Sequence, residues 1–115
     1  MKIIIIDDEK EICLMLGKIL AKLGHRVHCA HDCANAKILL KREQATLYFL
    51  DLNLPDGSGF DLISFIDHPA NIYFMSAWDG ESERKQVEAL NVNGFIHKPF
   101  TKKDITLIID QLPNE

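Results

Sequence analysis

Five polar side chains each follow a short apolar run of the chain, and their types together suit chemistry on phosphate. They are Asp7, Asp8, Asp51, Ser76 and Lys98. Three carboxylates brought together repel one another and require a cation, and oxygen ligands without histidine favour Mg²⁺, with Mn²⁺ as an alternative, over zinc. Magnesium leaves positions open for phosphate oxygens, and a lysine and a hydroxyl complete a site for a phosphoryl group. One carboxylate can then act as the nucleophile and form an aspartyl phosphate.

The apolar runs that precede these side chains predict the strands of a parallel sheet. The first run, Ile3–Ile6, is apolar and β-branched throughout, as in a strand buried on both faces. Further strands are predicted over 27–30, 46–50, 72–75 and 94–97, and helices over 12–23, 32–40, 58–66, 81–90 and 101–112. Five repeats of strand and helix predict an α/β sheet covered on both faces, with ligands bound where the carboxyl ends of the strands meet. The periodicity leaves the order of the strands open.

Composition limits the classes of protein to consider. A length of 115 residues with 47% hydrophobic residues predicts one domain spanning 1–115. The net charge is −4 and no basic run stands out, which argues against direct nucleic-acid binding. No apolar stretch is long enough for a membrane span or a signal peptide, so we expect a soluble, cytoplasmic protein. Three cysteines without a CxxC pair argue against a disulfide framework.

Four motifs, taken in order, resemble the receiver domains of two-component response regulators. They are DDE at 7–9, DLNLPDGSGFDL at 51–62, Ser76-Ala77 and the Lys98-Pro99-Phe100 segment. The resemblance covers the whole chain and implies a doubly wound five-stranded (βα)5 sheet of flavodoxin-like order 2-1-3-4-5. It also implies a phosphorylation-dependent signalling switch rather than a metabolic enzyme. The phosphoryl group would come from a sensor histidine kinase or a phosphotransfer protein. The downstream effector stays open, as does the choice between a monomer and a phosphorylation-promoted dimer.

The resemblance also implies roles for the acidic residues. Asp51 stands at the phosphoacceptor position. Asp8, Asp51 and the backbone carbonyl of Asn53 would ligate magnesium, and Asp7 would reach the metal through water.

A second group of residues would sense the phosphoryl group. Ser76 and the Ala77 amide would bind its oxygens, and Lys98 would pair with the Asp51 carboxylate or its phosphoryl group. Phe95 stands where the family keeps an aromatic switch residue, and without a hydroxyl it can work only by packing. The Lys98–Pro99 bond is expected to be cis. Trp78 departs from the family pattern as a bulky residue beside the mouth of the site.

Two other α/β functions fit the sequence less well. A phosphohydrolase that works through an aspartyl phosphate needs a second aspartate two residues after the nucleophile, where this chain has Asn53, and an amide cannot shuttle protons. A nucleotide-binding domain would carry GxGxxG or GxxxxGK[ST] after the first strand, and neither motif is present.

The stretch from Gly24 to Cys33 is rich in histidine and cysteine and invites a zinc hypothesis. Alternation along a strand scatters these side chains over two faces, so we expect no zinc site and predict that Cys29 is a buried small hydrophobe. Cys13 and Leu14 are predicted to point outward near the acidic site. For Leu14, kinase docking and incidental exposure both remain open.

Overall fold

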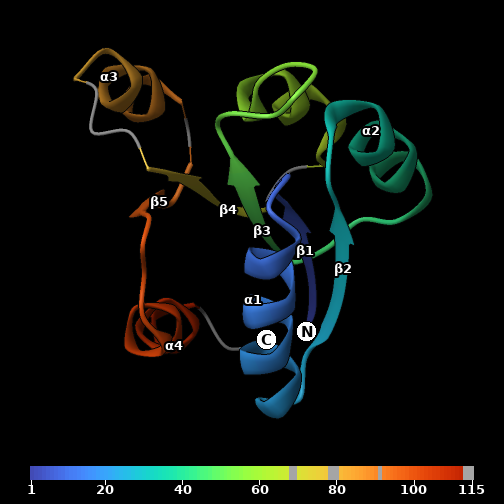
Figure 1. Ribbon diagram of the computed structural model, residues 1–115, viewed down its shortest axis with the longest axis vertical. Coiled ribbons are helices and arrows are strands. Elements are labelled where there is room, and N and C mark those ends of the chain that lie inside the picture. Colours follow the sequence, from blue (N-terminus) through green and yellow to red (C-terminus); the bar gives the residue numbers. More distant parts are fainter. Residues whose placement is uncertain (68–69, 78–80, 91, 113–115) are drawn as a thin grey trace.

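The computed structural model describes residues 1–67, 70–77, 81–90 and 92–112 of the chain. In this part of the chain five parallel strands form one sheet in the order β2-β1-β3-β4-β5 (Figure 1). The strands are β1 (Lys2–Ile6), β2 (Arg26–Ala30), β3 (Leu47–Asp51), β4 (Asn71–Ser76) and β5 (Gly94–His97). The predicted fold class and strand order are therefore confirmed.

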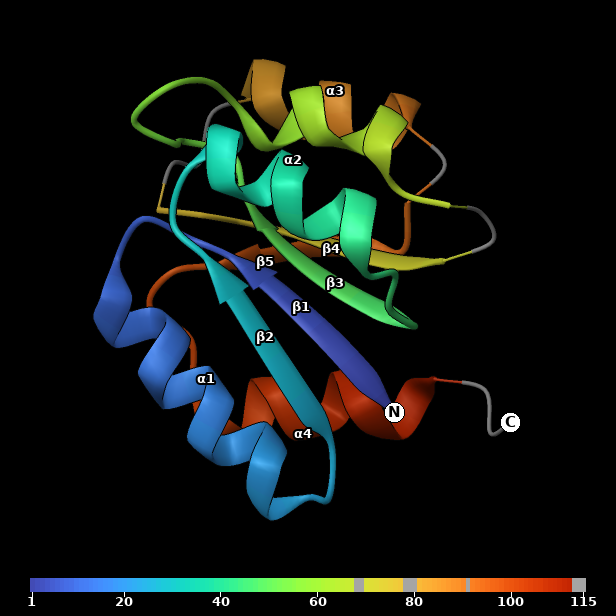
Figure 2. The ribbon, with the colours of Figure 1, turned by 90° about the vertical axis from the view of Figure 1, so that its right-hand side faces the viewer.

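Helices cover both faces of the sheet, as Figure 2 shows. Two of them, α1 (Lys10–Lys22) and α4 (Lys102–Gln111), lie on one face. The other face carries α2 (Cys33–Arg42), η1 (Gly59–Phe65) and α3 (Glu81–Ala89). The helix predicted over 58–66 is a 3₁₀ helix, with i to i+3 bonds such as Ile66 N–H to the Ile63 carbonyl at 3.1 Å. No helix in the described ranges is long and apolar enough to cross a membrane.

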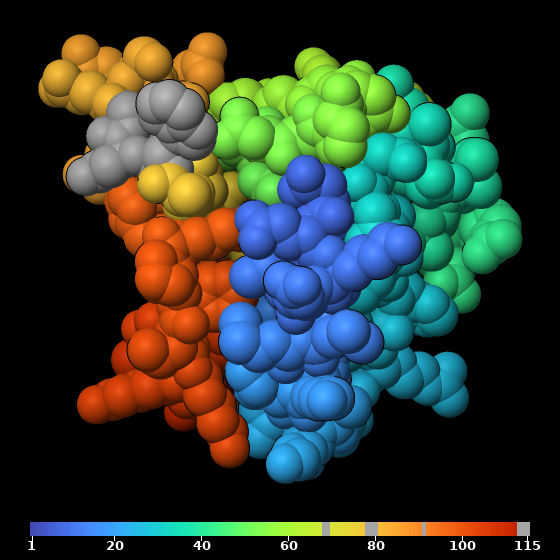
Figure 3. Space-filling model, viewed as in Figure 1, coloured from blue at the N-terminus to red at the C-terminus, as the bar shows by residue number. Residues whose placement is uncertain are grey.

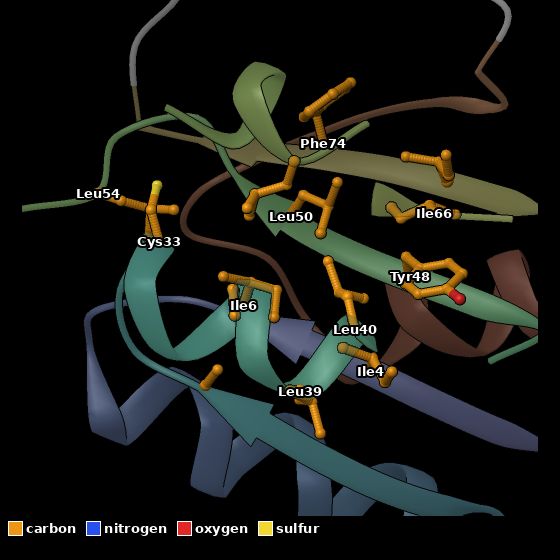
Figure 4. Close-up of a cluster of buried hydrophobic side chains, with 14 of the residues drawn as sticks. Ile4, Ile6, Cys33, Leu39, Leu40, Tyr48, Leu50, Leu54, Ile66 and Phe74 are labelled. Carbon is orange, nitrogen blue, oxygen red and sulfur yellow. The ribbon is translucent and has the colours of Figure 1, made fainter. Parts of the chain in front are cut away.

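The two central strands are buried on both faces, which confirms the prediction from their composition. Ile3–Ile6 and Leu47–Leu50 are fully buried. Alternation along each strand sends successive side chains to opposite faces. One set packs with α2, η1 and α3, as Ile4, Ile6 and Tyr48 do in Figure 4, and the other packs with α1 and α4. The aspartates that follow these strands are therefore attached to strands that helices cover on both faces.

The start of α2 is tied to the loop that follows β3. Asp32 caps the helix by accepting from the Asn35 N–H at 2.7 Å. The Asp56 carboxylate, from the loop, accepts from the N–H groups of Cys33 at 2.7 Å and Ala34 at 3.0 Å. In the sequence, Asp56 follows a proline and precedes a glycine, and this pattern indicates only a turn. Its hydrogen bonds to the start of α2 become visible only in the folded structure. This contact fixes the loop that begins at the end of β3.

Candidate functional site

Four strand ends bring the predicted polar side chains to one edge of the sheet. Asp51 is the last residue of β3 and Ser76 the last of β4, while Asp7 and Lys98 directly follow β1 and β5. Asp7 and Ser76 are fully buried and Asp51 is 4% exposed. Burial of three polar side chains at strand ends, against a core that is otherwise apolar, marks this edge as the place where chemistry is possible.

The three aspartates form a compact acidic cluster. Asp7, Asp8 and Asp51 each offer a carboxylate oxygen within 4.8 Å of the others, and Asp8 is exposed. Asp7 Oδ1 accepts a hydrogen bond from the Glu9 N–H at 2.9 Å, and Asp51 Oδ1 accepts one from the Asn53 N–H at 3.0 Å. These backbone bonds hold the two buried carboxylates in place. The predicted convergence of the aspartates is confirmed.

Lys98 reaches into the cluster and bridges its two buried members. Its Nζ lies 2.7 Å from Asp7 Oδ2 and 3.1 Å from Asp51 Oδ2. It also lies 3.4 Å from the carboxylate of Glu9, a contact that the sequence-based prediction did not include. Burial alone would lower the pKa of Lys98, but the hydrogen bonds and charges of Asp7 and Asp51 outweigh it and raise the pKa. The lysine therefore stays charged beside the carboxylates.

Asp51 is an unusually basic carboxylate. Burial raises its pKa to about 6, and the charge of Asp7 acts in the same direction. The hydrogen bond from the Asn53 N–H and the charge of Lys98 oppose this shift without cancelling it. At neutral pH the ionised form of Asp51 is thus costly, and any cation at the cluster would stabilise it.

The donor set of the cluster suits a hard divalent cation. Three carboxylates against one ammonium leave a surplus of two negative charges, and every donor is an oxygen. Such an acidic triad is typical of a magnesium site. Asn53, whose backbone carbonyl is predicted as a further ligand, lies exposed in the loop beside Asp51.

Local backbone features position the end of β3. The Leu52 N–H donates to the Met75 carbonyl at 3.0 Å, which continues the β3–β4 pairing past Asp51. A Cβ on Gly59 would collide with the Asp51 carbonyl, so only glycine allows η1 to pack this closely on the strand end. On the far side, the Lys98 N–H donates to the Ser76 carbonyl at 2.9 Å, and the predicted cis Lys98–Pro99 bond is confirmed.

The predicted sensing residues lie on the β4–β5 side of the cluster. Ser76 is buried, whereas Ala77 is exposed at the start of the following loop. Phe95 is half-buried and pairs in register with Phe74 of β4. Its ring meets the ring of His97 edge-on at 5.1 Å between centroids. Trp78 lies outside the described residues.

Two predictions about the cysteines are wrong. Cys13 was expected to point outward but is 5% exposed, because it shares the buried face of α1 with Leu16 and Leu20 at helical spacing. Cys29 was expected to be buried but is exposed, because β2 is the edge strand of the sheet. The prediction for Leu14 is confirmed, since its side chain is 63% exposed.

Comparison with known proteins agrees with this geometry. The family model of the response regulator receiver domain matches residues 3–110. The non-phosphorylated receiver domain of HemR from Leptospira biflexa is 29% identical, with a TM-score of 0.87 over 99% of this chain and 97% of that chain.

Two further solved structures share the fold at lower identity. A response regulator from Burkholderia pseudomallei, with a phosphorylated aspartic acid, a calcium ion and citrate, has a TM-score of 0.82 at 23% identity. The match covers 91% of this chain, which spans 64% of that one. TrrA from Thermotoga maritima, in complex with Mg²⁺ and beryllofluoride, has a TM-score of 0.82 at 21% identity over 97% of this chain and 98% of that chain.

The family match spans nearly the whole chain, and the sheet carries its acidic cluster at the edge where such a domain binds ligands. The chain therefore belongs to the response regulator receiver domains, the phosphorylation-dependent signalling modules that take their phosphoryl group from a histidine kinase.

Proposed function

We propose that Asp51 is the residue that accepts the phosphoryl group, from a sensor histidine kinase, a phosphotransfer protein or a small phosphodonor. The observation that carries this proposal is the position of its carboxylate at the end of central strand β3, 3.1 Å from Lys98 Nζ and clustered with Asp7 and Asp8. In the transfer, a carboxylate oxygen of Asp51 bonds to phosphorus as the bond from phosphorus to the donor breaks.

The surrounding residues would each have one task in that step. Asp8, Asp51 and the carbonyl of Asn53 would hold Mg²⁺ directly, and Asp7 would hold it through water. When bound, the ion supplies positive charge between the carboxylates and the phosphoryl oxygens. Lys98, held by Asp7 at 2.7 Å, is placed to neutralise charge that develops on the phosphoryl group.

The raised pKa of Asp51 supports this division of tasks. A carboxylate attacks phosphorus in its ionised form, and burial raises the pKa of Asp51 to about 6. The ionised fraction of Asp51 at neutral pH would rise if a cation were bound at the cluster, because the positive charge would lower that pKa. The acidic cluster would therefore bind the metal and also keep its own nucleophile charged.

Phosphorylation would be sensed on the β4–β5 side. A phosphoryl group adds a charge near −2 and strong acceptor oxygens, which would draw in the Ser76 hydroxyl and the Ala77 amide. Phe95 is half-buried beside β4, and its ring would move into the space that an inward shift of Ser76 and Ala77 leaves. The ring has no polar group to leave unpaired. The face built by α3, β5 and α4 then changes shape, by a population shift that a few kcal/mol can drive.

The solved relatives support the proposal by what they contain. One carries a phosphorylated aspartic acid with a calcium ion, and another carries Mg²⁺ with a beryllofluoride mimic of the phosphoryl group. We also propose that 1–115 forms one receiver domain. The effector stays open, as does the choice between a monomer and a phosphorylation-promoted dimer.

Incubation with acetyl phosphate and Mg²⁺ tests the proposal directly. We expect intact-mass spectra to show one added phosphoryl group on the wild type and none on Asp51→Asn. Asp110→Asn, on the exposed surface of α4, is the matched control and should be labelled like the wild type. Undiminished labelling of Asp51→Asn would place the acceptor elsewhere and refute the assignment.

A further inference from the structure

A pocket on the flank of the molecule brings together two of the three cysteines. The pocket, about 280 Å³ in volume, is lined by Lys10, Cys13, Leu14, Cys29 and His31, and we call it the thiol pocket. It lies between α1 and the edge strand β2, in the region where the blue atoms of α1 border the paler blue and teal atoms in Figure 3. None of these residues has a task in the proposed phosphoryl transfer.

Helix α1 and strand β2 approach closely beside this pocket. A Cβ on Gly17 would lie 4.0 Å from Val27 Cγ1, which is van der Waals distance, so this turn of α1 faces Val27 of β2. Cys13 is one helical turn from Gly17, about 6 Å along the axis. Cys29 is two residues from Val27, about 6.6 Å along the strand and on the same face. Because α1 runs antiparallel to the strands, both steps lead in the same direction and bring the two cysteines together.

The two thiols interact and differ in exposure. Cys13 is 5% exposed, whereas Cys29 is exposed at the free edge of the sheet. Each thiol shifts the pKa of the other: Cys29 raises the pKa of Cys13, in the same direction as burial, and Cys13 lowers the pKa of Cys29. Cys13 Sγ also lies 3.9 Å from His31 Nδ1 and 3.9 Å from the Asp7 carbonyl oxygen. The accessible sulfur therefore has a second thiol beside it, held in place by packing.

We propose that the thiol pocket is an oxidative modification site, at which a peroxide oxidises Cys29 and Cys13 then closes an intramolecular disulfide. The Cys29 sulfur attacks one peroxide oxygen, an S–O bond forms, the O–O bond breaks, and the leaving oxygen departs as water. The Cys13 sulfur attacks the resulting Cys29 sulfenic acid, the S–S bond forms, and a second water leaves with the proton of Cys13. The two thiols lose two electrons in total, and the peroxide is reduced to two molecules of water.

Cys33 provides an internal comparison for this proposal. It is buried, and its sulfur lies 3.8 Å from the Ser58 carbonyl on the opposite face of the sheet. Burial and the charge of Asp56 raise its pKa. Cys13 is buried too, but it lies beside Cys29, whereas Cys33 is enclosed on the other face of the sheet, away from the peroxide and from the Cys29 sulfur. Cys33 should therefore stay reduced while the other two cysteines are oxidised.

The test is peptide mapping of the reduced wild-type protein after treatment with hydrogen peroxide. Trypsin alone leaves Cys29 and Cys33 in one peptide, so a second protease that cuts before Asp32 is added to separate them. We expect the main product to be a monomer lighter by two hydrogens, with Cys13 linked to Cys29 and Cys33 free. A link to Cys33, a Cys29-linked dimer as the main product, or equal oxidation of all three cysteines would overturn the proposal.

Variants assign the order of the two steps. In Cys13→Ala, Cys29 should accumulate as a sulfenic acid that dimedone traps. In Cys29→Ala, Cys13 should stay reduced, and in Cys33→Ala the disulfide should form as in the wild type. Dimedone trapping at Cys13 in Cys29→Ala would reverse the assigned roles and contradict the proposal. Because the linked peptide is sought in the wild type, a loss of stability in Cys13→Ala leaves the main test intact.

Discussion

The helices α1 and α3 cover the same sheet but are attached to it very differently. Helix α1 buries Cys13, Leu16 and Leu20 against the sheet. Helix α3 has one buried side chain in its span, Glu81–Ala89, which is that of Val87. The difference suits two tasks: α1 holds the strand ends that carry the acidic cluster, while α3 covers the side on which we propose that phosphorylation is sensed.

The same contrast holds for the polar groups at the two sides. At the ends of β1 and β3, Asp7 and Asp51 already form short ion pairs with Lys98. On the β4–β5 side, Phe95 is half-buried and its ring contacts are apolar or edge-on. A prebuilt charge cluster loses little free energy to reorganisation when it reacts. A lightly packed helix needs little free energy to shift. The contrast therefore predicts that the reaction takes place at the acidic cluster and that the movement takes place on the β4–β5 side, which α3 covers.

The largest effect should come from truncating the side chain that anchors α1. Leu16→Ala removes a fully buried side chain and should lower the free energy of unfolding by about 3 to 4 kcal/mol. Val87→Ala removes two methyl groups from the single anchor of α3 and should cost about half as much, roughly 1.5 to 2 kcal/mol. Urea unfolding measures both. Equal losses would remove the contrast between the two helices.

The next effect concerns pH and the charge of the acidic cluster. The folded state raises the pKa of Asp51 from 3.8 to about 6, so between these values the unfolded chain has lost the proton and the folded chain keeps it. Stability from this group is therefore fully present below pH 4 and is lost as the pH rises to about 6, by about 3 kcal/mol in all.

The comparison of wild type with Asp51→Asn isolates this contribution. In urea unfolding without divalent cations, the difference in unfolding free energy between the two proteins should change from about pH 4 to about pH 7 and stay level above it. Millimolar Mg²⁺ should stabilise the wild type at pH 8 more than at pH 5, since the ion binds ionised carboxylates. Asp8→Ala should lose that gain. A pH-independent difference between wild type and Asp51→Asn would mean that burial does not shift Asp51.

The smallest expected effect on stability comes from Ser76→Ala. This variant is also the sharpest test of whether the β4–β5 side moves on phosphorylation. Loss of this buried hydroxyl should cost about 1 kcal/mol and leave phosphorylation of Asp51 intact. With beryllofluoride as the phosphoryl mimic, NMR should show large shifts at the Phe95 ring and the α3 amides of the wild type, and small ones in α1. In Ser76→Ala most of the Phe95 and α3 shifts should disappear.

Ser82→Ala, exposed on α3 itself, is the matched control and should respond like the wild type. A full response in Ser76→Ala would show that the signal runs by another route. Shifts of equal size in α1 and α3 would show that both sides move.

Local sequence patterns were enough to predict the strands and the acidic cluster. A run such as Ile3–Ile6 specifies a strand buried on both faces because every side chain is apolar and β-branched, whichever strands lie beside it. Asp7, Asp8 and Asp51 follow such runs, and parallel strands place their carboxyl ends together. The strand order rested on the family resemblance, since periodicity does not say which strands are neighbours.

Tertiary structure decided the features that depend on neighbours distant in the sequence. Cys29 is exposed because β2 lies at the edge of the sheet, and the same residue in a central strand would be buried. Asp56 caps α2 and Glu9 contacts Lys98 only because the fold brings together segments 23 and 89 residues apart. Alternation and helical spacing tell which way a side chain points relative to its own element, but the packing of the elements decides what it meets there.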